Sequence, residues 1–297
     1  MKLAPILRAR HERARSGARA SKTASKPILS ITTGTRNRPT SIERFVGSVL
    51  RSARVPFELL LAEASDRVPP YRSHDPRVRV LREDPPLGPV RGSNALFRRA
   101  SGSWVLFLND DLEVTPGWDE ALLAAAARFP KADLLCLPVL ERGEQSAKIL
   151  LYDGLPYACM GAVRREAGEA LGWWDEGYSF YAVDPDFALR MIATGRWLAP
   201  VTETCVVHHR AADEARVSHR ELLERDNERL RRLWVHRLPA LRRRYRRSSF
   251  RYFRNLETTY SETWKTKALE CPIDDAHPRP ARRPHRVDAP GWWIPWH

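Results

Sequence analysis

Short apolar runs alternate with segments of helical period through the first half of the chain. ILSITT (28–33), FELLLA (57–62) and WVLFL (104–108) are rich in apolar and β-branched residues, which is typical of buried strands. Residues 40–53 and 116–129 place apolar side chains at helical spacing. Because strands that alternate with helices usually pair in parallel, the sequence predicts a three-layer α/β/α sandwich around a mostly parallel sheet. Further strands are expected over 77–81, 133–139 and 197–209, and further helices over 90–100, 184–195 and 218–234.

Polar loops follow three of the predicted strands. GTRNRP (34–39) follows the first run, EASD (63–66) the second, and Asn109, Asp110 and Asp111 follow WVLFL. In a parallel sheet, ligands bind beyond the carboxyl ends of the strands. We therefore expect these three loops to meet at one crevice.

The two adjacent carboxylates at the end of WVLFL indicate a cation site. Asp110 and Asp111 repel each other unless a positive charge lies beside them. Hard oxygen ligands suit Mg²⁺ or Mn²⁺, which usually share their coordination sphere with substrate phosphates. The alternative is a polar turn in which Asp110 caps the next segment.

Length and composition limit the class of protein. The 297 residues allow one large domain or two small ones, and 43% of them are apolar. No stretch reaches the roughly 18 uninterrupted apolar residues of a membrane-spanning helix, and the N-terminus has no run typical of a secretory signal. The four cysteines are far apart and form no CxxC pair, which indicates a reducing, cytoplasmic compartment.

The net charge of +14 is concentrated at the two ends of the sequence. Residues 1–27 hold 8 Lys and Arg against 1 acid, residues 28–210 hold 22 against 23, and residues 211–297 hold 20 against 12. This distribution is typical of a nearly neutral catalytic core with basic attachments. Residues 1–26 are predicted to be a basic flexible arm, with a transit peptide as the alternative.

The order of these segments resembles the family 2 glycosyltransferases, which have the GT-A fold. The resemblance covers about residues 27–210. It is strongest in LGPVRGSNALFRRASGSWVLFLNDDLEVTPGWDEAL, where Asn109-Asp110-Asp111 takes the place of an Asp-x-Asp motif. The resemblance implies a GT-A-type domain, a nucleoside-diphosphate sugar donor, Mn²⁺ or Mg²⁺ as cofactor, and direct displacement with inversion.

The resemblance also implies which side chains bind the donor. Glu63 stands where the family usually has an Asp that reads the nucleotide base, and the arginines of TRNR can pair with a diphosphate or face solvent. The expected donor-binding residues are Thr33, Thr35, Arg36, Arg38, Glu63, Arg91, Asn94, Asn109 and Asp110.

For the metal, the resemblance implies Asp111 together with a histidine of VVHHR (206–210). His208 and His209 are adjacent, and both remain candidates. A neutral imidazole can join carboxylate and phosphate oxygens around Mn²⁺.

The segment GWWDEGYSFYAVDPDFALRM resembles the acceptor side of the family. It implies Asp184 as general base, although Val183 stands where the family usually has a Glu. Asp186 is the second candidate, and its alternative role is a first-turn acid favoured by the helix dipole. The expected acceptor-binding residues are Trp173, Trp174 and Asp175, with packing in the core as the alternative for the tryptophans.

Residues 211–271 are predicted to be a basic helical extension, and residues 272–297 a tail rich in Pro, Arg and Trp. The extension interleaves arginines with aromatic residues, a pattern suited to nucleic acid or to an anionic membrane surface. The alternative is a solvated helix that packs its aromatic residues on the core. The expected polyanion-binding residues are Arg242, Arg243, Arg244, Arg246, Arg247 and Arg251.

Three functions fit these observations. The first is a metal-dependent inverting glycosyltransferase that acts on a cell-surface saccharide or lipid-linked glycan, cytoplasmic and peripheral at the inner membrane face. The second transfers the sugar to a hydroxymethylated base in DNA, as virus-type DNA modification does. The third is a nucleic-acid-binding module of the same fold that has lost catalysis.

Overall fold

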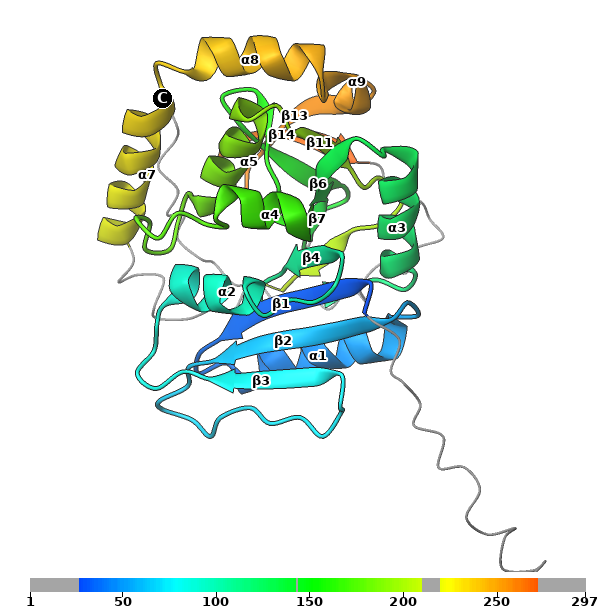
Figure 1. The fold of residues 1–297 in the computed structure, drawn as a ribbon, viewed down its shortest axis with the longest axis vertical. Helices are drawn as coiled ribbons and strands as arrows, with labels where there is room; N and C mark the ends of the chain where they lie inside the picture. Colours follow the sequence, from blue (N-terminus) through cyan, green and yellow to red (C-terminus); the bar gives the residue numbers. More distant parts are fainter. Residues whose placement is uncertain (1–26, 143, 210–219, 272–297) are drawn as a thin grey trace, which may run out of the picture.

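The computed structural model describes residues 27–142, 144–209 and 220–271, and each structural statement below concerns this part of the chain. The predicted arm (1–26) and tail (272–297) lie outside the described residues. Two sheets and their helices form one body, which is elongated in Figure 1. No helix in the described ranges combines the length and the apolar character that crossing a membrane requires.

The first sheet contains the strands that the sequence predicted most clearly. Its order is β11-β6-β10-β4-β1-β2-β3, and β10 alone runs against the other strands of this sheet. The central strand β1 is buried because it pairs in parallel with both β2 and β4. The bounds are β1 (Leu29–Thr35), β2 (Phe57–Glu63), β3 (Val78–Arg82), β4 (Trp104–Phe107), β6 (Ala132–Leu137), β10 (Met160–Arg164) and β11 (Trp197–Pro200).

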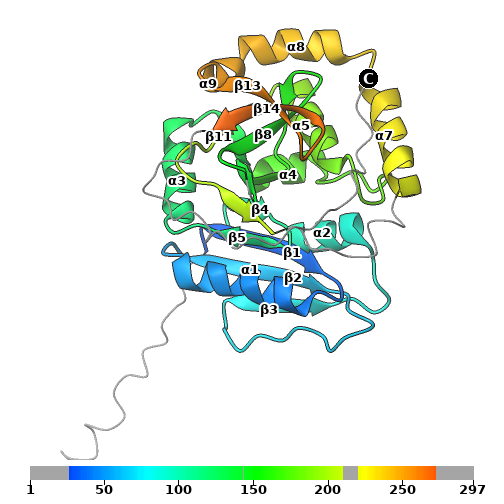
Figure 2. The same cartoon turned by 180° about the vertical axis from the view of Figure 1, so that it is seen from behind.

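Helices cover both faces of this sheet. Figure 2 shows α1 in front of β1 and β2, and the apolar side chains of α1 and α3 share one core cluster with the sheet. Those of α2, α4 and α5 contribute to the cluster on the other face. The predicted three-layer sandwich around a mostly parallel sheet is therefore confirmed. The bounds are α1 (Pro39–Ser52), α2 (Pro89–Phe97), α3 (Trp118–Arg128), α4 (Arg165–Leu171) and α5 (Val183–Ala193).

A second sheet, which the sequence did not predict, lies beside the first. Its order is β13-β14-β8-β7-β12-β5, and the short β9 pairs with β8. The chain enters it from β4 through residues 109–111, so the NDD motif connects the two sheets. The bounds are β5 (Leu112–Val114), β7 (Val139–Glu141), β8 (Ala147–Tyr152), β9 (Leu155–Pro156), β12 (Val206–His208), β13 (Glu257–Ser261) and β14 (Thr266–Cys271).

Residues 133–139 were predicted as one strand and form parts of two. β6 ends at Leu137 in the first sheet and β7 begins at Val139 in the second. Pro138 lies between them and lacks the N–H that would continue the ladder, which explains the break.

The C-terminal extension is helical over only part of the predicted range. Its helices are α7 (Arg220–Trp234), α8 (Leu238–Arg247) and α9 (Phe250–Phe253). Residues 257–271 instead form the β13–β14 hairpin, which pairs with β8. The β-branched and aromatic residues of ETTYS are compatible with this strand. The extension is thus part of both the helical layer and the second sheet.

Candidate functional site

The loops after β1 and β4 meet, as the strand order predicted. The hydroxyl of Thr35 donates to Asp110 Oδ2 at 2.7 Å, and this contact is buried. Arg38 Nη1 donates to Asp110 Oδ1 at 3.0 Å and lies 3.7 Å from Asp111 Oδ2. Burial raises the pKa of Asp110 above its ordinary value, although the charge of Arg38 opposes that rise. One cation and one hydroxyl therefore fix the NDD motif beside the end of β1.

Asp111 contacts a histidine from a distant strand. His208 Nε2 lies 3.3 Å from Asp111 Oδ1, and His208 Nδ1 lies 2.9 Å from Glu141 Oε1. All three side chains are buried. Burial disfavours the charged ring, but hydrogen bonds with Asp111 and then Glu141 outweigh it and raise the pKa of His208 to about 9.

The neighbouring histidine faces the other way. Successive side chains of a strand point to opposite faces. His209 Nε2 accordingly lies 2.9 Å from Glu113 Oε2, and the ring is only half-buried. Burial lowers the pKa of His209, and the charge of Arg44 adds to this effect. Of the two candidates that the sequence left open, His208 is the one whose side chain contacts the Asp111 carboxylate.

The donor atoms near Asp111 fit a metal ion that is shared with a substrate. Within the described ranges no group of three or more His, Cys, Asp or Glu side chains is arranged to hold an ion. Asp111 and His208 supply two donor atoms at a spacing close to the ~3 Å between neighbouring ligands of an octahedral ion. Mg²⁺ commonly takes one or two protein ligands and completes its sphere with water and phosphate oxygens.

The second candidate group of the site is the carboxyl of Asp184. It belongs to the first turn of α5, and the thiol of Cys159 is hydrogen-bonded to it. Burial raises the pKa of Asp184 to about 7, even though that hydrogen bond lowers it. The side chain of Asp184 nevertheless keeps some accessible surface. A carboxyl in this environment exchanges a proton near neutral pH.

The thiol of Cys159 experiences the charges of acids from both halves of the site. Burial raises the pKa of its thiol well above the ordinary value, and the carboxylates of Asp184, Glu141 and Asp111 add to that rise. These three acids come from α5, β7 and the loop after β4, and all act on one sulfur atom. Asp184 and Asp111 therefore both lie within electrostatic range of Cys159.

Comparison with known proteins concerns the first half of this arrangement. Residues 30–154 match the family described as "Glycosyl transferase family 2". This part, less than half of the chain, is similar to that family. The match includes the loops after β1, β2 and β4 and the NDD motif, and the predicted resemblance is confirmed.

Two named proteins are similar in sequence to this chain. The "O-antigen biosynthesis protein RfbC" of Myxococcus xanthus is 28% identical over 224 residues, 63% of this chain and 18% of that protein. The "N-acetylglucosaminyl-diphospho-decaprenol L-rhamnosyltransferase" of Mycobacterium tuberculosis (strain ATCC 25618 / H37Rv) is 26% identical over 242 residues, 64% of this chain and 78% of that protein. The chain thus spans less than a fifth of the first relative.

Among solved structures, S. aureus TarS 1–349 in complex with UDP-GlcNAc gives a TM-score of 0.47 at 17% identity. The similarity covers 64% of this chain and 60% of that chain. S. aureus TarS 1–349 on its own gives a TM-score of 0.45 at 16% identity, over 61% of this chain and 60% of that one.

Several of the residues predicted to bind the donor form contacts with other protein groups. Arg36 and Asn37 bind the exposed Asp66 in the loop after β2. Glu63 is fully buried, accepts a hydrogen bond from the Ser65 amide and forms an ion pair with Arg82. Thr33 is buried, and Asn109 is exposed at the start of the NDD motif.

Two predicted donor residues on α2 instead contact the acceptor segment. Asn94 donates to the Trp174 carbonyl and accepts from the Trp174 amide, and it donates to Glu176 Oε1 at 3.0 Å. Arg91 lies 3.6 Å from Glu176. Asn94 therefore holds the start of the acceptor segment against the donor half of the domain.

The predicted acceptor residues mostly support the fold. Trp173 is buried against Phe97, and Trp174 packs edge-on against the same ring. Asp175 accepts a hydrogen bond from Arg229 at 2.6 Å. Trp173 therefore packs in the core, which was the alternative to a role in acceptor binding. The exposed aromatic side chain of this segment is Phe180, which the sequence analysis did not single out.

Asp186 lies in the core and not in the crevice. Its carboxylate accepts hydrogen bonds from Arg190 Nε at 2.7 Å, from Trp234 Nε1 at 2.7 Å and from the Tyr178 hydroxyl at 3.2 Å. Only 1% of the residue is exposed. These contacts account for an acid at this position by structure alone, so Asp184 remains the candidate base.

Helix α7 of the extension holds the acceptor segment. The buried carboxylate of Asp226 accepts hydrogen bonds from the three successive backbone amides of residues 179–181, at 2.8–3.2 Å. Arg229 and Trp234 of the same helix reach Asp175 and Asp186. The only sequence signal for this role was an acid on the apolar face of an amphipathic helix.

Replacement of Asp226 by Ala should loosen this segment. Three backbone amides would lose their acceptor, so we expect the free energy of unfolding to fall by about 2 kcal/mol. Hydrogen exchange at residues 179–181 should become faster, as measured by mass spectrometry. Glu228→Ala is the control, because the exposed Glu228–Arg231 pair of α7 contributes less than about 1 kcal/mol. Equal effects of the two substitutions would contradict the role of Asp226.

Proposed function

We propose that this chain is a metal-dependent inverting glycosyltransferase that moves a sugar from a nucleoside-diphosphate sugar to an acceptor hydroxyl. The observation that carries the proposal is the Asp111–His208 contact, whose Asp111 lies in the segment that resembles family 2, together with the electrostatic effect of Asp111 and Asp184 on Cys159. It supports a diphosphate site with a proton acceptor nearby, as direct displacement requires.

In the proposed donor half, Asp111 and His208 hold the ion, and Arg38 lies beside them. When bound, Mn²⁺ or Mg²⁺ would offset the charge that grows on the leaving diphosphate. Thr35 and Arg38 fix Asp110, which keeps the loop after β4 in place while the donor binds. The guanidinium of Arg38 adds a second positive charge near the phosphates.

In the proposed acceptor half, Asp184 acts as general base. The acceptor oxygen bonds to the anomeric carbon, the bond from that carbon to the diphosphate oxygen breaks, and the carboxylate keeps the hydroxyl proton. A pKa of about 7 suits this role, because an efficient base titrates near the working pH. Val183, which stands where the family usually has a Glu, is buried in the core and takes no part.

We propose a saccharide acceptor, either a cell-surface glycan or a lipid-linked one. The names of the two relatives refer to an O antigen and to an N-acetylglucosaminyl-diphospho-decaprenol, which supports a saccharide acceptor. The donor sugar and its nucleotide remain to be identified by a screen.

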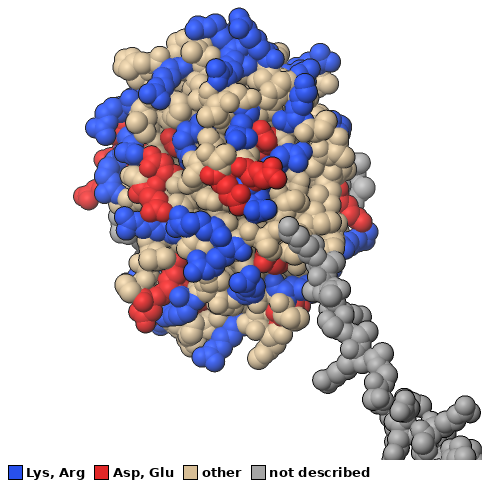
Figure 3. All heavy atoms as spheres, viewed as in Figure 1, with Lys and Arg blue, Asp and Glu red and all other residues tan. Residues whose placement is uncertain are grey.

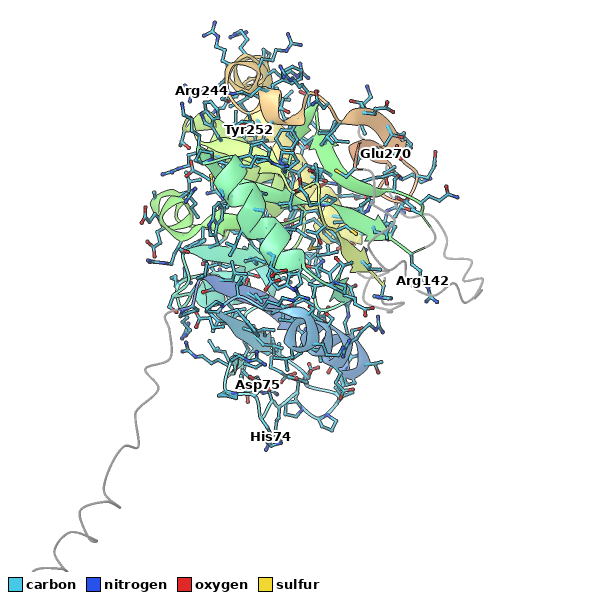
Figure 4. All side chains as sticks on the ribbon, turned by 90° about the vertical axis from the view of Figure 1, so that its right-hand side faces the viewer. His74, Asp75, Arg142, Arg244, Tyr252 and Glu270 are labelled. Atoms are coloured by element: carbon cyan, nitrogen blue, oxygen red, sulfur yellow. The ribbon has the colours of Figure 1, made fainter. Side chains whose placement is uncertain are left out.

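The basic surface of the extension supports a membrane-bound acceptor. Figure 3 shows Lys and Arg gathered over α8, and Figure 4 places Arg244 at the end of the molecule opposite His74. All six arginines predicted to bind a polyanion are exposed. Arg242 and Arg244 also bond to backbone carbonyls, and Arg251 stacks on Trp197.

Exposed apolar side chains near these arginines favour a lipid surface over nucleic acid. Leu233 and Val235 lie at the end of α7 and Phe250 begins α9, and each is 37–47% exposed. Apolar side chains among arginines suit the interface of an anionic bilayer, where both kinds of contact contribute. We therefore propose a peripheral position of the enzyme at the inner, cytoplasmic face of the membrane.

The donor reaction gives the first test. Radiolabelled nucleoside-diphosphate sugars would be screened against lipid extract, plain DNA and hydroxymethylated DNA, with Mn²⁺ or Mg²⁺ present. We expect transfer to a lipid-extract component. Asp184→Asn should lower transfer by about 10²–10⁴-fold and leave donor binding intact, because the base acts only in the chemical step. Asp111→Asn should abolish metal-dependent donor binding.

The exposed Asp153, which pairs with Arg242 away from the crevice, gives a control, and Asp153→Asn should behave as the wild type. Undiminished transfer in excess chelator would contradict the metal role. Loss of donor binding in Asp184→Asn would contradict the base assignment. Transfer to hydroxymethylated DNA alone would replace the proposed acceptor class.

Activity should depend on pH through Asp184. Below a pKa of about 7 the carboxyl is protonated and cannot accept the hydroxyl proton, so kcat/KM should fall about tenfold per pH unit there. Above pH 7 it should level off. Because the Cys159 hydrogen bond lowers this pKa, Cys159→Ala should move the acidic limb to higher pH. A limb near pH 4 in the wild type would contradict the assignment.

Vesicle binding tests the basic surface. The variant Arg243→Gln with Arg246→Gln should bind phosphatidylglycerol vesicles about thirtyfold more weakly, since each surface arginine contributes about 1 kcal/mol near anionic lipid. Arg67→Gln with Arg72→Gln, exposed in the loop between β2 and β3, is the matched control. Co-sedimentation measures both. Binding to duplex DNA without binding to vesicles would favour a nucleic-acid partner instead.

A further inference from the structure

His208 lies between two acids in the second sheet. Its strand β12 pairs in parallel with β7, where His208 is in register with Glu141. On its other side β12 pairs with β5, where His208 is in register with Leu112, the residue after Asp111. The sheet register therefore places one carboxylate on each side of the imidazole. Neither the motif nor the family resemblance pointed to Glu141.

The contacts of the His208 ring fix its orientation. Nδ1 lies 2.9 Å from Glu141 Oε1, Nε2 lies 3.3 Å from Asp111 Oδ1, and Glu141 is 3% exposed. Trp264 of the β13–β14 turn stacks on the ring at 5.8 Å with planes 19° apart. A flip of the imidazole would put a ring carbon in the place of each nitrogen and break both carboxylate contacts.

These contacts also select the tautomer of a neutral ring. An ionised carboxylate can only accept hydrogen bonds, so Nδ1 must carry the proton that it donates to Glu141. The lone pair of the neutral imidazole is then on Nε2, on the side of Asp111. In many metal sites a second acceptor orients a ligating histidine in this way.

We propose that Glu141 is a positioning residue that keeps His208 Nε2 directed at the metal site beside Asp111. The inference rests on the metal-dependent function proposed above and extends it to a residue that does not touch the ion. Glu141 would orient the ring through the hydrogen bond that it accepts from His208 Nδ1. A side chain that retains an acceptor at this position should therefore retain much of the effect.

The chain contains a matched control pair. His209 and Glu113 form the same type of contact at the same 2.9 Å, one residue after the end of β12. That pair is partly exposed, and His209 contacts Asp111 through its backbone amide, which donates to the Asp111 carbonyl and not to the carboxylate. Removal of Glu113 therefore changes a histidine–glutamate contact without changing the ring beside Asp111.

Mn²⁺ binding to the full chain in the presence of UDP would be measured by isothermal titration and by EPR. Glu141→Met, which fills the space without an acceptor, should weaken Mn²⁺ binding about 10–100-fold. Glu141→Gln, which keeps an acceptor, should stay close to the wild type, and so should Glu113→Met. Pulsed EPR should detect an imidazole nitrogen on Mn²⁺ in the wild type, lost in His208→Ala and retained in His209→Ala.

The outcomes separate this inference from the proposed function. Wild-type Mn²⁺ affinity in Glu141→Met would overturn the role of Glu141 and leave the metal-dependent function standing. Absence of Mn²⁺ binding to the wild type would overturn both. Thermal unfolding verifies that each variant is folded. If Glu141→Met does not fold, Glu141→Gln decides: loss of the imidazole signal in that folded variant would overturn the inference.

Discussion

The buried contact between Asp111 and His208 depends on how the chain passes between its two sheets. Asp111 is the last residue before β5, so it lies where the chain leaves the central first sheet for the second. His208 ends β12, which pairs with β5. The contact therefore requires both sheets to be complete, and Arg38 and Thr35 add a third constraint from the loop after β1. Two carboxylates are tolerated side by side because a guanidinium and an imidazole lie against them.

The C-terminal extension is built into this arrangement. Helix α7 fixes the turn before Asp184 through Asp226, and the β13–β14 hairpin places Trp264 on the ring of His208. The two halves of the candidate site, from distant parts of the chain, thus each rest on the extension. Its outer surface carries the exposed arginines, so one segment combines support of the site with the proposed membrane contact.

The fold was predictable from the sequence where a segment carries its own pattern. WVLFL is apolar throughout because β4 is central, and the helix over 40–53 places its apolar side chains on one face. The second sheet was missed because its short strands show no period of their own and become strands only through pairing. The hairpin after α9 was missed for the same reason.

The candidate site divides in the same way. Sequence order and family resemblance pointed to Asp111, to a histidine of the VVHHR segment and to Asp184, because each lies at the end of a recognisable element. Cys159 and Glu141 carried no signal, and Asp226 carried only that of an acid on the apolar face of a helix, since their roles depend on registers and packing across the fold. Trp173 and Asp186 had types that suit a site, yet burial assigns them to the core.

The sequence by itself determined that polar loops end apolar strands, and hence that acidic side chains lie at one edge of a mostly parallel sheet. Only the tertiary structure decided which of two adjacent histidine side chains faces Asp111 and which second acid contacts it. The reason is geometric: side chains alternate along a strand, so the choice depends on the register of β12 with β5 and β7.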